Sequence, residues 1–294
     1  MKKTTIVGGA LALVGFLTGS LHAQIYVANN GNSTIGEYGL DGSTVNASLI
    51  SLETPSGLAI SGGDLFVASG SIGEYGLDGS TVKASLISPK TGPSSLGLAI
   101  SGGDVFVLTG SFKKNGTSTI GEYGLDGSTI NDSLISGLPS ASGLAISDGH
   151  IFVANSGSTI GEYGLDGSTI NASFISGLNK PNGLAISGGD LFVANNGNNT
   201  IGEYGLDGST VNASLISGLN NPNGLAISDG DIFVANSGNG TIGEYGLDGS
   251  TINASLISGL NGPVSIAVAP TPEPSTLALM GLGLTGLLAL RRRK

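Results

Sequence analysis

Short apolar runs alternate with glycine-, asparagine- and aspartate-containing turns along most of this chain. In one representative stretch the runs cover residues 183–187 (GLAIS), 191–195 (LFVAN), 200–206 (TIGEYGL) and 210–217 (TVNASLIS). The turns between them contain Gly188-Gly189, Asn196-Gly197 and Asp207-Gly208. Such dipeptides between runs rich in β-branched residues are strong β-hairpin signals. Three successive hairpin turns predict a meander of four antiparallel strands.

This four-strand pattern repeats through the chain. The string GEYGLDGST occurs six times, and a segment close to GLAISGGDLFVA precedes most copies. The glutamates of the six copies are Glu37, Glu74, Glu122, Glu162, Glu203 and Glu244. Six copies within residues 24–269 give a period of about 41 residues, which is typical of four-stranded propeller blades.

The two ends of the repeat region complement each other. The region begins with a second strand near Ile25 and finishes with an inner strand at 264–268, which can complete the blade formed by residues 25–51. An open solenoid would need capping repeats at its ends, and the sequence has none. We therefore predict an all-β, six-bladed β-propeller whose ends pair with each other. The connection 218–223 (GLNNPN) contains a proline, which cannot donate to a β-ladder, so we expect it to run between blades.

The blades resemble those of NHL-repeat and related six-bladed propellers. Residues 181–185 (PNGLA) are similar to the NHL inner strand, and residues 191–195 (LFVAN) are similar to its second strand. The third strand departs from the NHL pattern, because glycine stands where those proteins usually have arginine. The resemblance implies a propeller fold. It also implies an enzyme as the alternative function, since some six-bladed propellers are calcium- or zinc-dependent lactonases that gather Glu, Asn and Asp at the central tunnel.

The N-terminal segment predicts export. Lys2 and Lys3 precede an apolar run from Ile6 to Leu17, and Ala23 provides a small residue for cleavage. This order is typical of a secretory signal peptide, so we assign residues 1–23 to it. An N-terminal membrane anchor is the alternative, but it needs about 20 apolar residues.

The C-terminal segment, residues 270–294, has three parts in a fixed order. Pro272, Glu273 and Pro274 come first, an apolar stretch runs to Leu290, and a basic cluster follows. That cluster is Arg291, Arg292, Arg293 and Lys294. The order resembles the PEP-CTERM sorting signal of Gram-negative bacteria that make exopolysaccharide. The resemblance implies a transmembrane helix with its basic end in the cytoplasm and processing by an exosortase. A plain C-terminal membrane anchor is the alternative.

The composition of residues 24–269 limits the classes of partner that this part of the chain is expected to bind. This body has five lysines, no arginine and 20 acidic residues, which leaves a formal charge near −15. Such a charge repels phosphate backbones and argues against nucleic-acid binding. Cysteine is absent, so the exported body depends on its apolar core for stability.

Two groups of residues are candidates for ligand binding. Loops at one end of the blades are rich in asparagine, whose side-chain amide donates and accepts hydrogen bonds without charge and so suits sugar hydroxyls. The candidates are Asn155, Asn182, Asn195, Asn196, Asn223 and Asn236. Asparagine also favours turns with positive φ, which is the structural alternative. Lys113 and Lys114, in an inserted loop of the third repeat, could dock an acidic polysaccharide or another surface protein; a tolerated surface insertion is the alternative.

The acidic residues favour structural roles. The Asp-Gly turns could hold calcium, but no copy has an EF-hand-like loop, and turn formation explains them. Six identical glutamates suggest a structural ladder, and His150 replaces a turn aspartate, so we expect it to be an exposed turn residue. Catalysis requires one constellation whose surroundings differ from the rest. We predict no catalytic residues, metal site or cofactor. The sequence thus predicts an exported binding or structural propeller, with a metal-dependent lactonase- or lyase-like enzyme and a ligand-free scaffold as alternatives.

Overall fold

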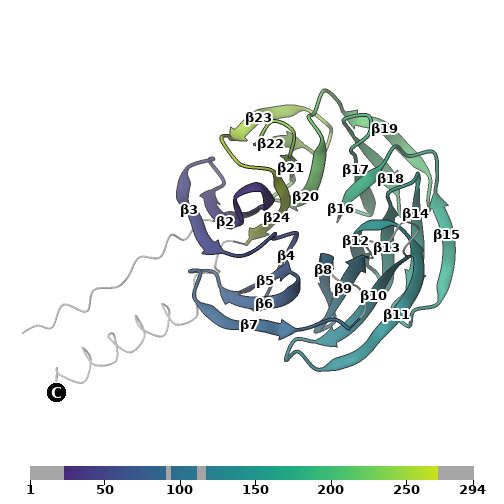
Figure 1. Ribbon diagram of the computed structural model, residues 1–294. Helices are drawn as coiled ribbons and strands as arrows, with labels where there is room; N and C mark the ends of the chain where they lie inside the picture. Colours follow the sequence, from purple (N-terminus) through teal and green to yellow (C-terminus); the bar gives the residue numbers. More distant parts are fainter. Residues whose placement is uncertain (1–22, 91–93, 111–116, 271–294) are drawn as a thin grey trace, which may run out of the picture. The chain divides into compact units, whose positions relative to one another are not determined.

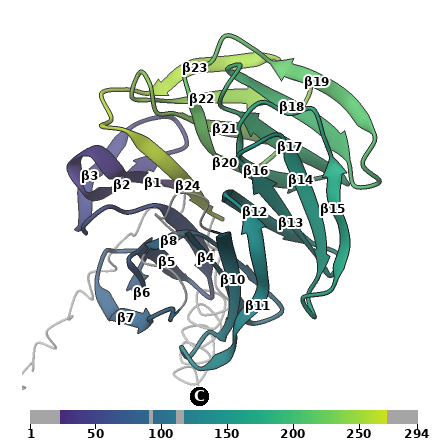
Figure 2. The same ribbon diagram turned by 45° about the vertical axis from the view of Figure 1, so that its right-hand side comes forward.

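The structure is a computed structural model that describes residues 23–90, 94–110 and 117–270. The predicted signal peptide up to residue 22, the sorting segment from residue 271 and the inserted lysines therefore lie outside the described residues. Within the described part, 24 strands form six four-stranded antiparallel sheets. Figure 1 shows these sheets as blades around a common centre, and Figure 2 shows the same ring turned by 45°. The prediction of an all-β, six-bladed propeller is confirmed.

Each blade contains four strands in order from the axis outward. The inner strands are β24 (Pro263–Ala269), β4 (Gly57–Ser61), β8 (Ser94–Ser101), β12 (Ala141–Ser147), β16 (Pro181–Ser187) and β20 (Pro222–Ser228). The second strands are β1 (Gln24–Asn29), β5 (Asp64–Ser69), β9 (Asp104–Gly110), β13 (His150–Asn155), β17 (Asp190–Asn195) and β21 (Asp231–Asn236). The third strands are β2 (Thr34–Gly39), β6 (Ser71–Gly76), β10 (Thr117–Gly124), β14 (Thr159–Gly164), β18 (Thr200–Gly205) and β22 (Thr241–Gly246). The outer strands are β3 (Thr44–Ser51), β7 (Thr81–Ile87), β11 (Thr129–Pro139), β15 (Thr169–Ile175), β19 (Thr210–Ile216) and β23 (Thr251–Ile257).

We number the blades from the N-terminus, so that blade 1 contains β1, β2 and β3 with β24 as its inner strand. A short 3-10 helix, η1 (Asn30–Asn32), joins β1 to β2. The strand β24 pairs antiparallel with β1, with Gln24 opposite Ala269 and Ala28 opposite Ser265. Neighbouring inner strands contact each other around the axis, including β24 with β4. The ring therefore closes through its two ends, as the sequence predicts.

Pro222 corrects one expectation. It does not lie between blades but is the first residue of β20, as Pro181 is of β16 and Pro263 is of β24. Pro222 pairs with Asn236 of the second strand. Proline is tolerated here because it occupies the first position of a strand at the edge of its sheet. The connection between blades 5 and 6 is consequently shorter than predicted and covers residues 217–221.

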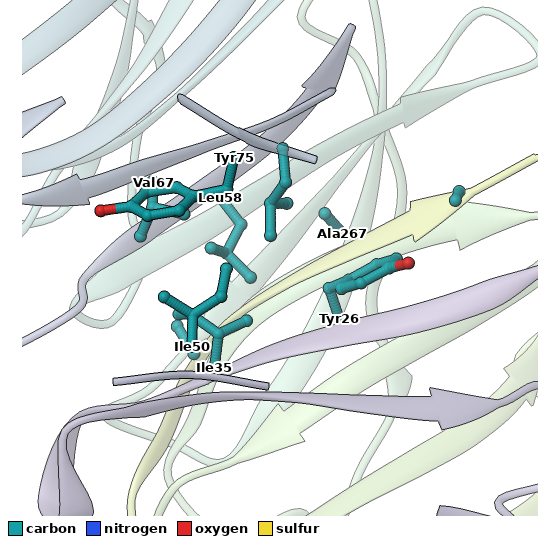
Figure 3. Close-up of a cluster of buried hydrophobic side chains, with 10 residues drawn as sticks. Tyr26, Ile35, Ile50, Leu58, Val67, Tyr75 and Ala267 are labelled. Atoms are coloured by element: carbon teal, nitrogen blue, oxygen red, sulfur yellow. The ribbon is translucent and has the colours of Figure 1, made fainter. Parts of the chain in front are cut away.

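The apolar core consists of layers between adjacent blades. One layer contains Tyr26 and Ile35 of blade 1 together with Leu58, Val67 and Tyr75 of blade 2 (Figure 3). On the other face of β1, Ile25 and Val27 belong to the layer shared with blade 6. Successive residues of a strand point to opposite faces, and both faces of each second strand are covered. This explains why the second strands are apolar without alternation.

The glycine that replaces the NHL arginine makes room for a tyrosine. A Cβ atom on Gly202 would lie 2.7 Å from Cε2 of Tyr204, because the tyrosine ring folds back over its own strand. The corresponding pairs of the other blades have the same geometry, for example Gly36 with Tyr38. The tyrosine ring fills the space between blades that a longer residue at the glycine position would otherwise occupy.

In blades 4 and 5 the inner strand approaches the next one so closely that its glycine leaves no room for a side chain. A Cβ atom on Gly143 would lie 2.3 Å from the carbonyl oxygen of Asn182, and one on Gly183 would lie 2.1 Å from that of Asn223. The strand β24 differs from the others by having Ser265 at this position. Its Oγ accepts a hydrogen bond of 3.1 Å from the Leu58 N–H of β4. The contact that closes the ring therefore includes a hydrogen bond made by a residue unique to the last strand.

We expect Gly183→Ala to destabilise the propeller by about 1–3 kcal/mol, because the new methyl group forces β16 and β20 apart. Gly157→Ala is the matched control, since a Cβ atom there meets no atom within 4 Å. Urea unfolding of the two variants and the wild type measures the difference. Equal stabilities for the two variants would contradict the close packing at the axis.

Candidate functional site

The two ends of the propeller differ in charge. Turns between the inner and second strands and between the third and outer strands lie at one end, which we call the aspartate face. Its aspartates are Asp41, Asp78, Asp126, Asp148, Asp166, Asp207, Asp229 and Asp248, and Asp64, Asp104, Asp190 and Asp231 begin second strands at the same end. The opposite end, which we call the asparagine face, contains the loops between second and third strands and the connections between blades. Among the acidic residues that the structure describes, Glu53 is the one that lies in a loop of this face.

A polar hollow lies on the asparagine face across three adjacent blades. Its volume is about 430 Å³, which falls within the range of about 300–1,000 Å³ usual for ligand sites. It is lined by Ser156 of blade 4, by Lys180, Pro181, Asn182 and Asn196 of blade 5, and by Asn223 of blade 6. The hollow thus combines three amides, a hydroxyl and an ammonium group.

The backbone hydrogen bonds of the loops fix the walls of the hollow. The N–H of Asn196 donates to the carbonyl of Lys180 at 3.2 Å, and its side-chain Nδ2 donates to the carbonyl of Pro222 at 3.2 Å. Asn196 therefore connects blades 5 and 6. In contrast, the side chains of Asn182 and Asn223 are half-buried and make no hydrogen bond within the described part of the chain. Their amides remain available to a ligand.

Lys180 has a left-handed backbone conformation, with φ of 49°. The equivalent residues Ser140 and Asn221 have φ of 50° and 49°. In each case the carbonyl accepts a hydrogen bond from the first residue of the loop between second and third strands, for example from Ser156 N–H to Ser140 at 3.0 Å. The conformation is therefore required by the blade connection, whichever side chain stands there.

The structure separates the six predicted asparagines into two groups. Asn182, Asn196 and Asn223 come together in the hollow. Asn155, Asn195 and Asn236 are the last residues of β13, β17 and β21, and their exposed fractions are only 3%, 2% and 2%. The second group belongs to the interior, because each strand end is covered by the neighbouring strands, as where Asn195 pairs with both Pro181 and Thr200. Lys113 and Lys114 lie outside the described residues. Lys180 and Ser156 were not predicted.

A second narrow cavity of about 130 Å³ follows the axis. Its walls come from the inner strands and consist of glycine, leucine and serine residues with Asn182, Asn223 and a few aliphatic side chains. No carboxylate is among these lining residues. Among the residues that the structure describes, no group of three or more His, Cys, Asp or Glu side chains is arranged to hold a metal ion.

His150 corrects another expectation. It is not only an exposed turn residue but the first residue of β13, and its Nδ1 lies 2.7 Å from Oε1 of the buried Glu162. Its ring stacks on Phe152 with a centroid distance of 6.4 Å. The equivalent residue in blades 2, 3, 5 and 6 is an aspartate, and in blade 1 it is Gln24. His150 thus supplies blade 4 with a hydrogen-bond partner where other blades have a second acid.

The repeated glutamates and aspartates have opposite pKa shifts. Burial, and then the charge of Asp104, Asp190 or Asp231, raises the pKa of Glu122, Glu203 and Glu244 above the ordinary 4.5. In the Asp-Gly turns, hydrogen bonds from the serine two residues later lower the pKa of the aspartate below 3.8, as for Asp207 with Ser209. The Ser209 N–H donates to Asp207 Oδ1 at 2.9 Å, which supports turn formation as the role of these aspartates.

Family comparisons support the sequence resemblance. The PEP-CTERM protein-sorting motif matches residues 270–294, and the NHL repeat matches residues 178–204 and 219–245. The chain carries NHL repeats and a PEP-CTERM sorting motif. The motif implies export, sorting toward the cell surface or exterior, and processing by an exosortase. Within residues 23–90, 94–110 and 117–270, no helix is long and apolar enough to cross a membrane.

Solved structures share the propeller fold at low sequence identity. A chain of a nidogen/laminin complex has a TM-score of 0.69 and 16% identity, covering 85% of this chain and 100% of its own. A protein of unknown function from Bacteroides caccae has a TM-score of 0.66 and 17% identity, with coverages of 84% and 98%. The gluconolactonase XC5397 from Xanthomonas campestris has a TM-score of 0.57 and 16% identity, with coverages of 70% and 76%. At these identities the likeness concerns the fold alone. A comparison with curated proteins finds no match to this sequence.

The opposite pKa shifts predict that stability peaks in mild acid. The raised glutamates oppose folding when ionised, so their penalty is relieved as pH falls through their raised pKa. The turn aspartates stabilise the fold when ionised, and this contribution is lost as pH falls through their lowered pKa. We expect the Tm to rise from pH 7 to a maximum near pH 4–5 and to fall below about pH 3.5.

Thermal unfolding across this pH range tests the expectation. The triple variant Glu122→Gln, Glu203→Gln and Glu244→Gln should flatten the rise that occurs as pH falls toward the ordinary glutamate pKa of 4.5. Glu53→Gln is the control, because this exposed residue lies in a loop outside the ladder. A triple variant that keeps the full rise would show that other groups cause it.

Proposed function

We propose that this chain is an exported, non-catalytic surface propeller that binds polysaccharide through the hollow of the asparagine face. The observation that carries the proposal is the pair of half-buried amides of Asn182 and Asn223, which lie in one hollow without partners among the described residues. Amides both donate and accept hydrogen bonds and remain uncharged, as recognition of sugar hydroxyls requires. The sorting motif and the propeller fit an exported surface protein.

The domain organisation follows from the same proposal. Residues 1–23 act as a signal peptide, residues 24–269 form the propeller, and residues 270–294 act as the sorting segment. In this segment an apolar helix holds the chain in the inner membrane of a Gram-negative bacterium until the exosortase processes it near Pro272, Glu273 and Pro274. Exopolysaccharide or another surface protein is then the partner of the released propeller.

A metal-dependent lactonase is the competing function, because a gluconolactonase shares the fold. The central cavity of this chain favours the binding role, since its lining consists of small and aliphatic residues with two asparagines and no carboxylate. Calcium and catalytic zinc sites in proteins depend on carboxylate or imidazole ligands. Elemental analysis of the purified chain, together with a lactone-hydrolysis assay with and without chelator, separates the two functions. A tightly held divalent ion and chelator-sensitive hydrolysis would establish the enzyme instead.

The binding role predicts that the double variant Asn182→Ala and Asn223→Ala loses polysaccharide affinity. Two to three hydrogen bonds of about 0.5–1.5 kcal/mol each correspond to a loss of roughly tenfold or more. The full-length chain, purified in neutral detergent, is titrated with soluble polysaccharides by biolayer interferometry. The Tm of the double variant should stay close to that of the wild type, because neither asparagine side chain makes a hydrogen bond to the described residues.

Asn212→Ala with Asn253→Ala is the matched control. These exposed asparagines belong to the outer strands of the same two blades and hydrogen-bond only to nearby serine N–H groups. The control should bind as the wild type does. Equal polysaccharide affinity of the two double variants would show that the hollow is not the binding site.

A further inference from the structure

Lys180 is the cation of the hollow. The structure shows no carboxylate within ion-pair distance of it in the described part of the chain. The other described lysines have acidic neighbours: Lys90 Nζ lies 4.0 Å from Asp132, and Lys83 lies opposite Glu74 in the β-ladder. Lys180 therefore presents an ammonium group beside the unpartnered amides of Asn182 and Asn223 without a counter-charge from the protein.

The charge distribution makes this ammonium group effective although the body is strongly acidic. The aspartates concentrate at the opposite end of blades whose strands are six to seven residues long, or roughly 20 Å. The Debye length at physiological ionic strength is about 8 Å. The far aspartates are thus screened from the hollow, and Glu53 is the one acid in the described loops of its own face.

The blade connection itself does not require a lysine at this position. What it requires is a left-handed residue whose carbonyl oxygen accepts the hydrogen bond from the neighbouring loop, and Asn221 meets that requirement in blade 6. A residue other than glycine, asparagine or aspartate in this conformation costs about 1–2 kcal/mol. Ser140 has the same conformation in blade 4, so the strain belongs to the connection, and the positive charge is what Lys180 adds to it.

We propose that the hollow selects acidic polysaccharides and that Lys180 pairs with a uronate carboxylate while the neighbouring amides bind ring hydroxyls. This inference rests on the proposed polysaccharide binding and adds the class of sugar. A carboxylate fits because it supplies a counter-charge to this exposed ammonium group, whereas a neutral sugar offers it only uncharged hydrogen-bond acceptors.

The test compares polygalacturonate with its methyl ester at 0.15 M NaCl, two polymers with the same sugar backbone whose carboxyl groups are ionised in the first and esterified in the second. We expect the full-length wild-type chain to bind polygalacturonate about two- to fivefold more tightly than the ester, since Lys180 is exposed and its ion pair is screened by solvent. Lys180→Asn should abolish this preference and retain binding of the ester. Asparagine suits the left-handed conformation, so this variant keeps the fold. Lys180→Arg should keep the preference because it keeps the charge.

Lys90→Asn is the matched control, because it makes the same change in net charge on the same face, outside the hollow. It should keep the wild-type preference. If Lys180→Asn keeps the preference, or Lys90→Asn loses it equally, the inference is overturned while the proposed function stands on binding of the ester. If the wild type binds neither polymer, the inference and the proposed function both fail. If it binds both equally, only the choice of an acidic ligand fails.

Discussion

Each second strand of this propeller has to be covered on both faces, and the rest of the structure follows from that constraint. The run of β1 is buried toward blade 6 through Ile25 and Val27 and toward blade 2 through Tyr26 and Ala28. A linear array would leave such a strand bare at each end. A closed ring has no bare end, and pairing of β24 with β1 closes it. Because cysteine is absent, these apolar layers stabilise the body without disulfides.

The sequence predicts the fold well because its signals are local and repeated six times. Turn dipeptides define the strands, and the offset between the first and last strands defines the closure. The position of Pro222 was missed because the rule against proline in a ladder is relaxed at the edge of a sheet, and the edge is a property of the assembled blade. His150 was misplaced for a related reason: its contact with Glu162 depends on the pairing of β13 with β14.

The candidate site was only partly predictable. Asn195 and Asn196 are adjacent and chemically identical, yet one ends a covered strand and the other lines the hollow. Composition cannot distinguish them, whereas the register of the strand end does. The signal for Lys180 was present as a departure from the repeat, since the equivalent residue of blade 6 is Asn221. In a chain of near-identical copies, the positions that differ carry the information about function. The two faces differ accordingly. The aspartates of the aspartate face form turns, whereas residues that differ between blades, such as Lys180 and Asn221, lie on the asparagine face.

Because the blades are nearly identical, their strands could also pair in other combinations. Any inner strand of the PNGLAIS type could in principle pair with any second strand, so five or seven blades, or exchange of a blade between two molecules, would bury similar apolar surface. Ser265 breaks this degeneracy. It occurs in the last inner strand alone, and the bond from the Leu58 N–H to its Oγ is made only when β24 lies beside β4. A ring closed by β24 is therefore distinguished from a ring closed by another inner strand by one additional hydrogen bond.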